Sequence, residues 1–107
     1  MAFDEELDAR VAEVVGPWGT TRKKMFGGAG YLLNGNLLAG VHKNHLVLRL
    51  GEEAAASVMT DPRARVFDIT GRPMAGWAMI EPVEIDDDQL VLWLSGAKAY
   101  VETLPPK

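Results

Sequence analysis

Apolar residues recur at steps of three and four near both ends of the chain. The first such stripe, within residues 3–15, consists of Phe3, Leu7, Val11, Val14 and Val15. This spacing places the apolar side chains on one face of a helix, and the acids in its first turn suit the helix dipole. Gly16 and Pro17 follow the last apolar position and end the predicted helix.

A longer stripe of the same kind lies near the end of the sequence. It comprises Leu90, Trp93, Leu94, Ala97, Val101 and Leu104. Aspartates at residues 86–88 precede it, and we interpret them as helix capping, because they lack the alternating spacing of a calcium loop. Pro105 and Pro106 end this second predicted helix.

The segment between residues 23 and 50 has no helical period. Asn34 and Gly35 separate two apolar runs, and Asn-Gly is typical of a tight β-hairpin, because both residues tolerate positive φ angles. Lys43 and Asn44 form a second predicted turn, between residues 37–42 and 45–50. The pattern therefore predicts three antiparallel strands in succession.

Alternation within the third of these strands predicts which side faces the core. Leucines at positions 46, 48 and 50 point to one face, and His45, Val47 and Arg49 point to the other. We expect the leucine face to be buried and the other face to be mixed.

The remaining segments predict a short helix and two more strands. Alanines and first-turn acids favour a helix within residues 51–61, and Pro62 follows it. Residues 65–69 and 75–81 are predicted strands, joined by a turn at residues 70–73. In the last strand both faces are apolar, which indicates that both are covered.

These elements follow the order α-β-β-β-α-β-β-α. Consecutive hairpins favour an antiparallel sheet, and the amphipathic helices need a surface on which to bury their apolar faces. The predicted fold is therefore α+β, with two layers and a sheet of about five strands.

Composition limits the class of protein. The chain has 107 residues, of which 48% are hydrophobic and 24% charged, a balance typical of one globular domain. The absence of cysteine excludes disulfides, thiolate metal sites and thiol nucleophiles. The acidic amino terminus does not have the pattern of a signal peptide, and no apolar run reaches membrane-spanning length. We expect a cytoplasmic location.

Charge is distributed unevenly along the chain. The net charge is -4, yet residues 21–50 contain five bases, both histidines and no acid. Such a stretch could form a positive surface for phosphate or for an acidic partner. The alternative is that these bases lie on different sides of the sheet and pair with acids from the helices.

Residues with catalytic or ligand-binding potential do not form a recognisable motif. Glycines within residues 27–30 lack the third glycine of a dinucleotide fingerprint and the ending of a P-loop. His42 and His45 flank a turn, but two imidazoles do not complete a metal site. Ser57 and Ser95 fall inside predicted helices and outside any nucleophile elbow. We expect no enzyme activity, no cofactor and no metal site.

Four short motifs are spread along the chain. They are Lys23-Lys24-Met25-Phe26-Gly27-Gly28, Tyr31-Leu32-Leu33-Asn34-Gly35-Asn36, Thr70-Gly71-Arg72-Pro73-Met74 with Gly76-Trp77, and Leu104-Pro105-Pro106-Lys107. Together they resemble the amino-terminal domain of the TfoX/Sxy family, from the first helix to the last. The resemblance implies a two-layer α+β domain spanning residues 1–107, and it supplies no catalytic residue.

The resemblance also implies a regulatory role. The family's namesake regulates natural competence genes together with a cyclic-AMP-dependent activator at promoters, and it has a second, carboxy-terminal domain. These 107 residues correspond to the first domain only.

We therefore expect a small regulatory or protein-interaction module. Its partner would be a protein, such as a component of the transcription machinery, and both a monomer and a homodimer fit the sequence. The candidate partner-binding residues are Arg22, Lys23, Lys24, Lys43, Arg49 and Arg72. The second hypothesis is direct nucleic-acid binding by residues 21–50, which the acidic chain as a whole disfavours.

Overall fold

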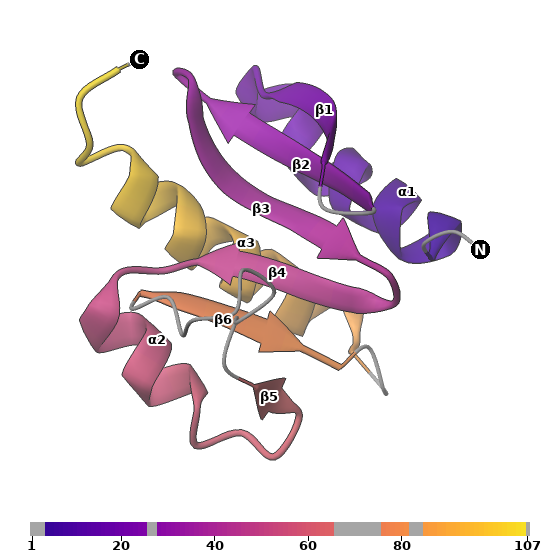
Figure 1. Cartoon of the computed structure of the whole chain (residues 1–107), viewed down its shortest axis with the longest axis vertical. Coiled ribbons are helices and arrows are strands. Elements are labelled where there is room, and N and C mark those ends of the chain that lie inside the picture. Colours follow the sequence, from indigo (N-terminus) through magenta and orange to yellow (C-terminus); the bar gives the residue numbers. More distant parts are fainter. Residues whose placement is uncertain (1–3, 26–27, 66–75, 82–84, 107) are drawn as a thin grey trace.

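A computed structural model of the chain describes residues 4–25, 28–65, 76–81 and 85–106. Its elements, in chain order, are α1 (Glu5–Val15), the 3₁₀ turn η1 (Gly16–Trp18), β1 (Thr21–Met25), β2 (Gly28–Leu33), β3 (Asn36–His42), β4 (His45–Arg49), α2 (Glu52–Val58), β5 (Ala64–Arg65), β6 (Trp77–Ile80) and α3 (Asp87–Val101) (Figure 1). The α+β class and the general order of elements are confirmed.

The described strands form one antiparallel sheet in the order β1-β2-β3-β4-β6-β5. It has one strand more than the predicted order, because residues 21–25 form an edge strand of their own that pairs with β2. No Asn-Gly turn sequence separates β1 from β2. The hydrophobic pattern therefore predicted a single strand where the structure has two. The predicted strand at residues 65–69 and the turn at residues 70–73 lie outside the described residues, apart from Arg65 in β5.

The predicted hairpin turns are confirmed. Asn34 and Gly35 have φ angles of 54° and 82°, as a two-residue hairpin requires, and Lys43 has a φ of 55°. The buried Asn36 side chain donates a 2.9 Å hydrogen bond to the carbonyl oxygen of Pro105. This bond ties the segment after α3 to the β2–β3 hairpin.

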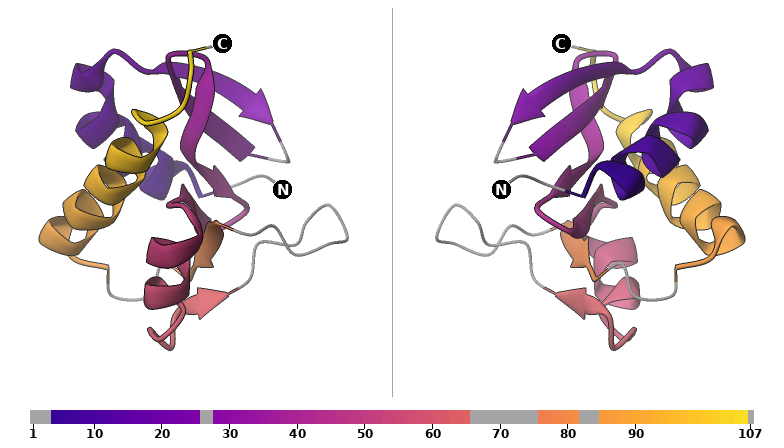
Figure 2. Two further views of the ribbon diagram at one scale, coloured as in Figure 1. Left: turned by 90° about the vertical axis from the view of Figure 1, so that its left-hand side faces the viewer. Right: turned by 90° about the vertical axis from the view of Figure 1, so that its right-hand side faces the viewer.

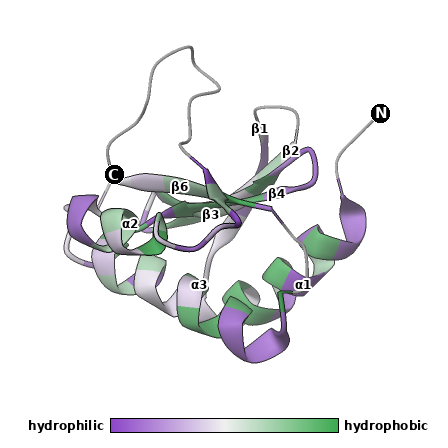
Figure 3. Cartoon of the chain, turned by 90° about the horizontal axis from the view of Figure 1, so that it is seen from below, coloured by the Kyte–Doolittle hydropathy of each residue, from purple (hydrophilic) through white to green (hydrophobic). Residues whose placement is uncertain are grey.

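Helices α1 and α3 lie side by side against one face of the sheet (Figures 2 and 3). The strands turn two rows of side chains toward them: Tyr31, Ala39, Leu48 and Ala78, and Ala29, Val41, Leu46 and Ile80. Most described residues of the two predicted stripes are buried there, including Val11 of α1 and Leu94 of α3, each fully buried. Val14 and Leu104 are half-buried, and Phe3 lies outside the described residues. Packing of the two helices on these rows forms the core.

The opposite face is covered unevenly. Val47 is fully buried on this side, whereas Trp77 and Met79 are half-buried. Both faces of the predicted last strand are thus at least partly covered, although the helix-facing side is the drier one.

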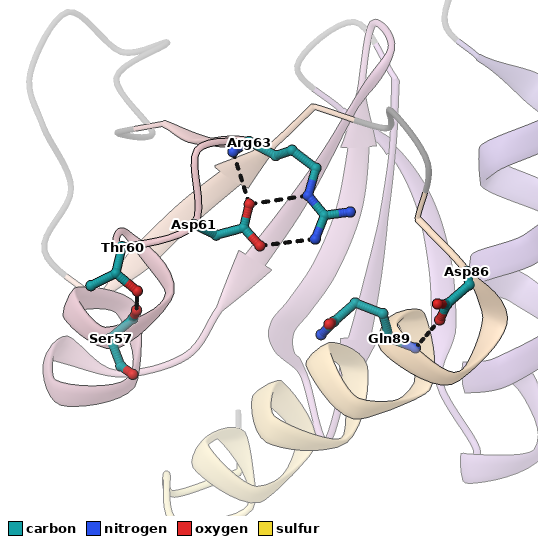
Figure 4. A network of polar contacts seen from close by, with 6 residues as sticks. All are labelled: Ser57, Thr60, Asp61, Arg63, Asp86 and Gln89. Atoms are coloured by element: carbon teal, nitrogen blue, oxygen red, sulfur yellow. Dashed lines mark hydrogen bonds and ion pairs between the residues drawn. The ribbon is translucent and has the colours of Figure 1, made fainter.

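Two aspartates begin the long helices as caps. Asp4 accepts a 3.0 Å hydrogen bond from the backbone N–H of Leu7 at the start of α1. Asp86 accepts a 2.7 Å bond from the backbone N–H of Gln89 at the start of α3 (Figure 4). The capping interpretation of the residue 86–88 aspartates is confirmed for Asp86, because its carboxylate satisfies a backbone donor that the first helical turn leaves free.

Candidate functional site

The predicted basic residues occupy separate places in the fold. Arg22, Lys23 and Lys24 are on the edge strand β1, Lys43 is in the β3–β4 turn, and Arg49 ends β4. Arg72 lies outside the described residues. Arg49 and Lys43 are at opposite ends of the same strand, so the arginine does not join the lysine at one surface.

Arg22 takes part in a polar cluster between β1, β2 and α1. Its guanidinium donates a 2.8 Å hydrogen bond to one carboxylate oxygen of Asp8, and the Tyr31 hydroxyl donates a 2.6 Å bond to the other. Bonding to Asp8 raises the pKa of Arg22. Burial, followed by the bond to Asp8, raises the pKa of Tyr31 to about 12. Arg22 therefore joins the acid-rich helix to the acid-free strand.

Arg49 stacks on aromatic rings. Its guanidinium carbon lies 5.4 Å from the centre of the Trp77 ring and 5.9 Å from that of the Tyr100 ring. Both distances are within the range of a cation–π interaction. The side chain connects the end of β4 to β6 and to α3.

Lys23, Lys24 and Lys43 are exposed, and no ion pair within the described ranges includes them. Lys24 shares the helix-covered face with Arg22, and Lys23 points to the other face. Lys24 and Lys43 are brought to the same end of the sheet, because Lys24 aligns through β2 with Val41, two residues before the turn.

The acidic start of α1 lies beside the Lys43 turn. The backbone N–H of Asp4 donates a 2.7 Å hydrogen bond to the carbonyl oxygen of Lys43. Glu5 and Glu6 follow in the first turn of the helix. The acidic side chains at the start of α1 therefore reduce the positive electrostatic potential around the Lys43 turn, at this end of the sheet.

The two histidines are direct neighbours, as expected from their positions around the turn. His42 and His45 form a cross-strand pair, and burial lowers the pKa of His45. No cluster of three or more His, Cys, Asp or Glu side chains suited to a metal ion occurs in the described segments. The glycine-rich residues 28–30 form the start of β2, and the next element is the strand β3 and not a helix.

A groove that the sequence analysis missed runs between α2 and α3. Its volume is about 760 Å³. The α3 side is lined by Leu92, Trp93, Gly96, Ala99 and Tyr100. The α2 side is lined by Glu52, Glu53, Ala54, Ser57 and Val58, and Leu50 and Gly51 complete the lining. Most of these side chains are apolar or small, and the charged ones are both acids.

One feature of the sequence indicates the α3 wall of the groove. Leu92 lies outside the core stripe of α3 and is 68% exposed, which is unusual for a large apolar side chain in this fold. Leu92, Gly96 and Ala99 recur at helical spacing on a second side of α3. That row identifies a possible contact face, but only the position of α2 beside it makes a groove.

An aspartate–arginine pair holds the segment after α2 in place (Figure 4). Asp61 accepts a 2.9 Å bond from the Arg63 backbone N–H and bonds of 3.0 and 2.8 Å from its guanidinium. The Arg63 side chain, and then its backbone N–H, lower the pKa of Asp61 to about 2. The same guanidinium lies 5.1 Å from the centre of the Trp93 ring. The pair thus fastens this segment to α3 beside the groove.

The groove between the helices presents apolar area and two carboxylates. Among the described helices, none combines the length and the hydropathy of a membrane-spanning segment.

Comparison with known families covers most of the chain. The family model described as the TfoX N-terminal domain matches residues 13–100 of the 107. No curated protein and no solved structure matches the chain. The matched span contains the described sheet, α2 and all but the last residue of α3, and it includes the motifs at residues 23–36 and 70–77 that suggested the resemblance. On this match, the chain belongs to the TfoX N-terminal domain family.

Proposed function

We propose that the protein is a cytoplasmic regulatory domain that acts by binding another protein and carries out no chemistry of its own. The observation that carries this proposal is the groove between α2 and α3, with Leu92 68% exposed at its wall. Exposed apolar area at a groove is one of the features of surfaces that bind other molecules, proteins among them. Membership of the TfoX N-terminal domain family supports the regulatory part of the proposal.

Capture from a lysate of the native cells tests this function. The immobilised protein is compared with Leu92→Asp, which places a charge on the groove wall, and with Ser95→Asp, which places the same charge on an exposed position of α3 outside the lining. Bound proteins are identified by mass spectrometry. A protein kept by wild type and Ser95→Asp and lost with Leu92→Asp supports the proposal. Equal capture by all three, or capture of nothing, contradicts it.

The alternative function is direct binding of nucleic acid. The observation in its favour is that Lys23, Lys24 and Lys43 are exposed and outside the ion pairs of the described residues. Phosphate neutralisation makes affinity fall steeply with salt. A gel-shift series from low to physiological salt, with Lys23→Glu/Lys24→Glu beside wild type, distinguishes the two functions. Salt-sensitive binding that the double variant lacks supports nucleic acid, and absence of binding at low salt discards it.

A further inference from the structure

Gly96 is placed in α3 where the fold itself does not need a glycine. Among the described residues outside its own helix, a Cβ added there would meet only a terminal methyl carbon of Leu50, at the ordinary contact distance of 3.6 Å. Glycine within a helix costs about 1 kcal/mol relative to alanine. The residue lines the groove, so its missing methyl group leaves space for atoms that approach from outside the molecule.

The walls of the groove favour a helical occupant. They are formed mostly by side chains of α3 and of the later residues of α2, where the backbone N–H groups are bonded within the helices; the N–H groups of residues 52–54, in the first turn of α2, have no acceptor within that helix. Elsewhere along the groove an extended segment would bury N–H and C=O groups without partners, which is unfavourable. A helix satisfies its own backbone groups and needs only an apolar face to fill a groove.

The charges of the groove favour a basic partner. Glu52 and Glu53 are exposed in the first turn of α2, and the described residues of the lining include no lysine or arginine. The nearby guanidinium groups of Arg63 and Arg49 lie over the lining rings of Trp93 and Tyr100, and Arg63 is paired with Asp61. Complementary charge chiefly sets specificity and the rate of association.

A second copy of the chain fits the groove less well. A symmetric contact through this groove would place Glu52 and Glu53 of both copies in one interface, and the described lining contributes no base to offset their charge. Like charges opposed in an interface disfavour association. The more favourable occupant is a segment from a different protein.

We propose that the groove binds an amphipathic helix of a partner protein whose apolar face is bordered by lysine or arginine. This inference rests on the function proposed above and adds the chemistry of the partner. Leucine-type anchors at i, i+3, i+4 and i+7 would pack against Leu92 and over Gly96, and the basic residues would face Glu52 and Glu53.

Binding of designed peptides tests the inference directly. The probes are a labelled helical peptide with leucines at these positions and lysines elsewhere, and a second peptide with the same leucines and glutamates in place of the lysines. Fluorescence anisotropy gives the affinities, and amide chemical shifts show where on the protein the peptide lies. We expect binding of the lysine peptide, with shifts in α2 and α3, and at least tenfold weaker binding of the glutamate peptide.

Two matched pairs of variants assign the binding to the groove. Gly96→Ala should raise the melting temperature and weaken the lysine peptide about tenfold or more, because the new methyl group occupies the contact space. Ser95→Ala should leave the affinity unchanged. Glu52→Gln/Glu53→Gln should weaken binding about three- to tenfold at low salt, and Glu5→Gln/Glu6→Gln, in the first turn of α1, should change it less than twofold.

The opposite results would overturn the inference. Equal affinity for both peptides, an equal effect of the two glutamate pairs, or no effect of Gly96→Ala each excludes a basic helix in this groove. If Leu92→Asp nevertheless abolishes capture of a natural partner, the proposed function holds and only the chemistry assigned to the partner is wrong. A concentration-dependent dimer in sedimentation equilibrium that Leu92→Asp abolishes assigns the groove to a second copy and also overturns the inference.

Discussion

At the scale of single residues, the bonding of Asp8 joins α1 to the sheet. The residue is only 9% exposed, and its carboxylate accepts bonds from the Tyr31 hydroxyl and the Arg22 guanidinium. A buried carboxylate is unfavourable unless it is paired and hydrogen-bonded. Two donors from β1 and β2 therefore make α1 compatible with a polar residue on its sheet-facing side.

Removal of the Tyr31 hydroxyl tests the strength of this cluster. Tyr31→Phe should lower the free energy of unfolding by about 1–3 kcal/mol at pH 9, because Asp8 loses one buried donor. Urea unfolding measures the loss, and Tyr100→Phe, at a half-buried position on α3, serves as the control.

The same variant has a defined pH dependence. The folded-state pKa of Tyr31 is about 12, above the ordinary value of 10.0. The stability that its neutral hydroxyl contributes is therefore complete below pH 10.0 and declines as pH rises through about 12, because the unfolded chain ionises first. The difference between wild type and Tyr31→Phe should shrink between pH 9 and about pH 11.5. An unchanged difference would show that burial and the bond to Asp8 do not raise the pKa of Tyr31 in the folded protein.

At the scale of secondary-structure elements, the junction of β4 and α2 depends on Gly51. Its φ and ψ angles are 87° and 158°, a region that essentially only glycine adopts. A Cβ there would lie 2.7 Å from a ring carbon of Tyr100. The turn that places α2 beside α3, and thus forms the groove, requires glycine for two reasons. Its backbone angles are accessible essentially only to glycine, and the ring of Tyr100 leaves no room for a side chain.

Comparison of two glycines separates these requirements. Gly19 has a φ of 84° and a ψ of 28°, and a Cβ added to it would have no atom of the described part of the chain within 4 Å. Gly19→Ala should destabilise the protein by about 1–2 kcal/mol, the cost of a left-handed non-glycine residue. Gly51→Ala should cost at least about 1 kcal/mol more, because the ring of Tyr100 must also move. Equal melting temperatures of the two variants would contradict the close approach at Gly51.

The Asn34–Gly35 turn was predictable from the sequence, whereas the separate strand β1 was not. Asn34 and Gly35 were predictable because a two-residue hairpin imposes positive φ at both positions, and only a few residue types meet that condition. The separate strand β1 was not predictable, since Thr21–Met25 has neither strict alternation of apolar residues nor a recognised turn sequence after it. Its strand conformation depends on pairing with β2.

At the scale of the whole molecule, α3 packs against the sheet with one side and lines the groove with another. Leu94 is fully buried against the sheet layer, and Leu92 is 68% exposed beside the groove. The two leucines differ in environment because residues two apart on an α-helix point to nearly opposite sides. The same helix thus contributes to the core and to the candidate binding surface.

Truncation of each leucine tests this division. Leu94→Ala should lower the free energy of unfolding by about 2–5 kcal/mol, because it leaves a cavity in the core. Leu92→Ala should change it by less than about 0.5 kcal/mol, because its side chain is already in contact with water. Urea denaturation followed by far-UV circular dichroism measures both, and similar losses would mean that α3 is oriented differently on the sheet.

The candidate site was only partly predictable from the sequence, because it depends on contacts between segments that are far apart along the chain. The sequence analysis identified the acid-free segment, but Arg22 is bonded to Asp8, Arg49 is stacked on Trp77 and Tyr100, and the acidic start of α1 lies beside Lys43. Charge along a chain becomes charge on a surface only after distant segments are placed together. The groove was missed because its walls are more than thirty residues apart in sequence.

The sequence by itself determined the amphipathic helices, the hairpin turns and the leucine face of β4, because each depends on residues within a few positions of one another. Only the tertiary structure decided that an acid-rich helix is joined to a basic strand through Asp8 and Arg22, and that α2 and α3 enclose a groove. These features arise from contacts between residues far apart along the chain, whose relative positions no local periodicity contains.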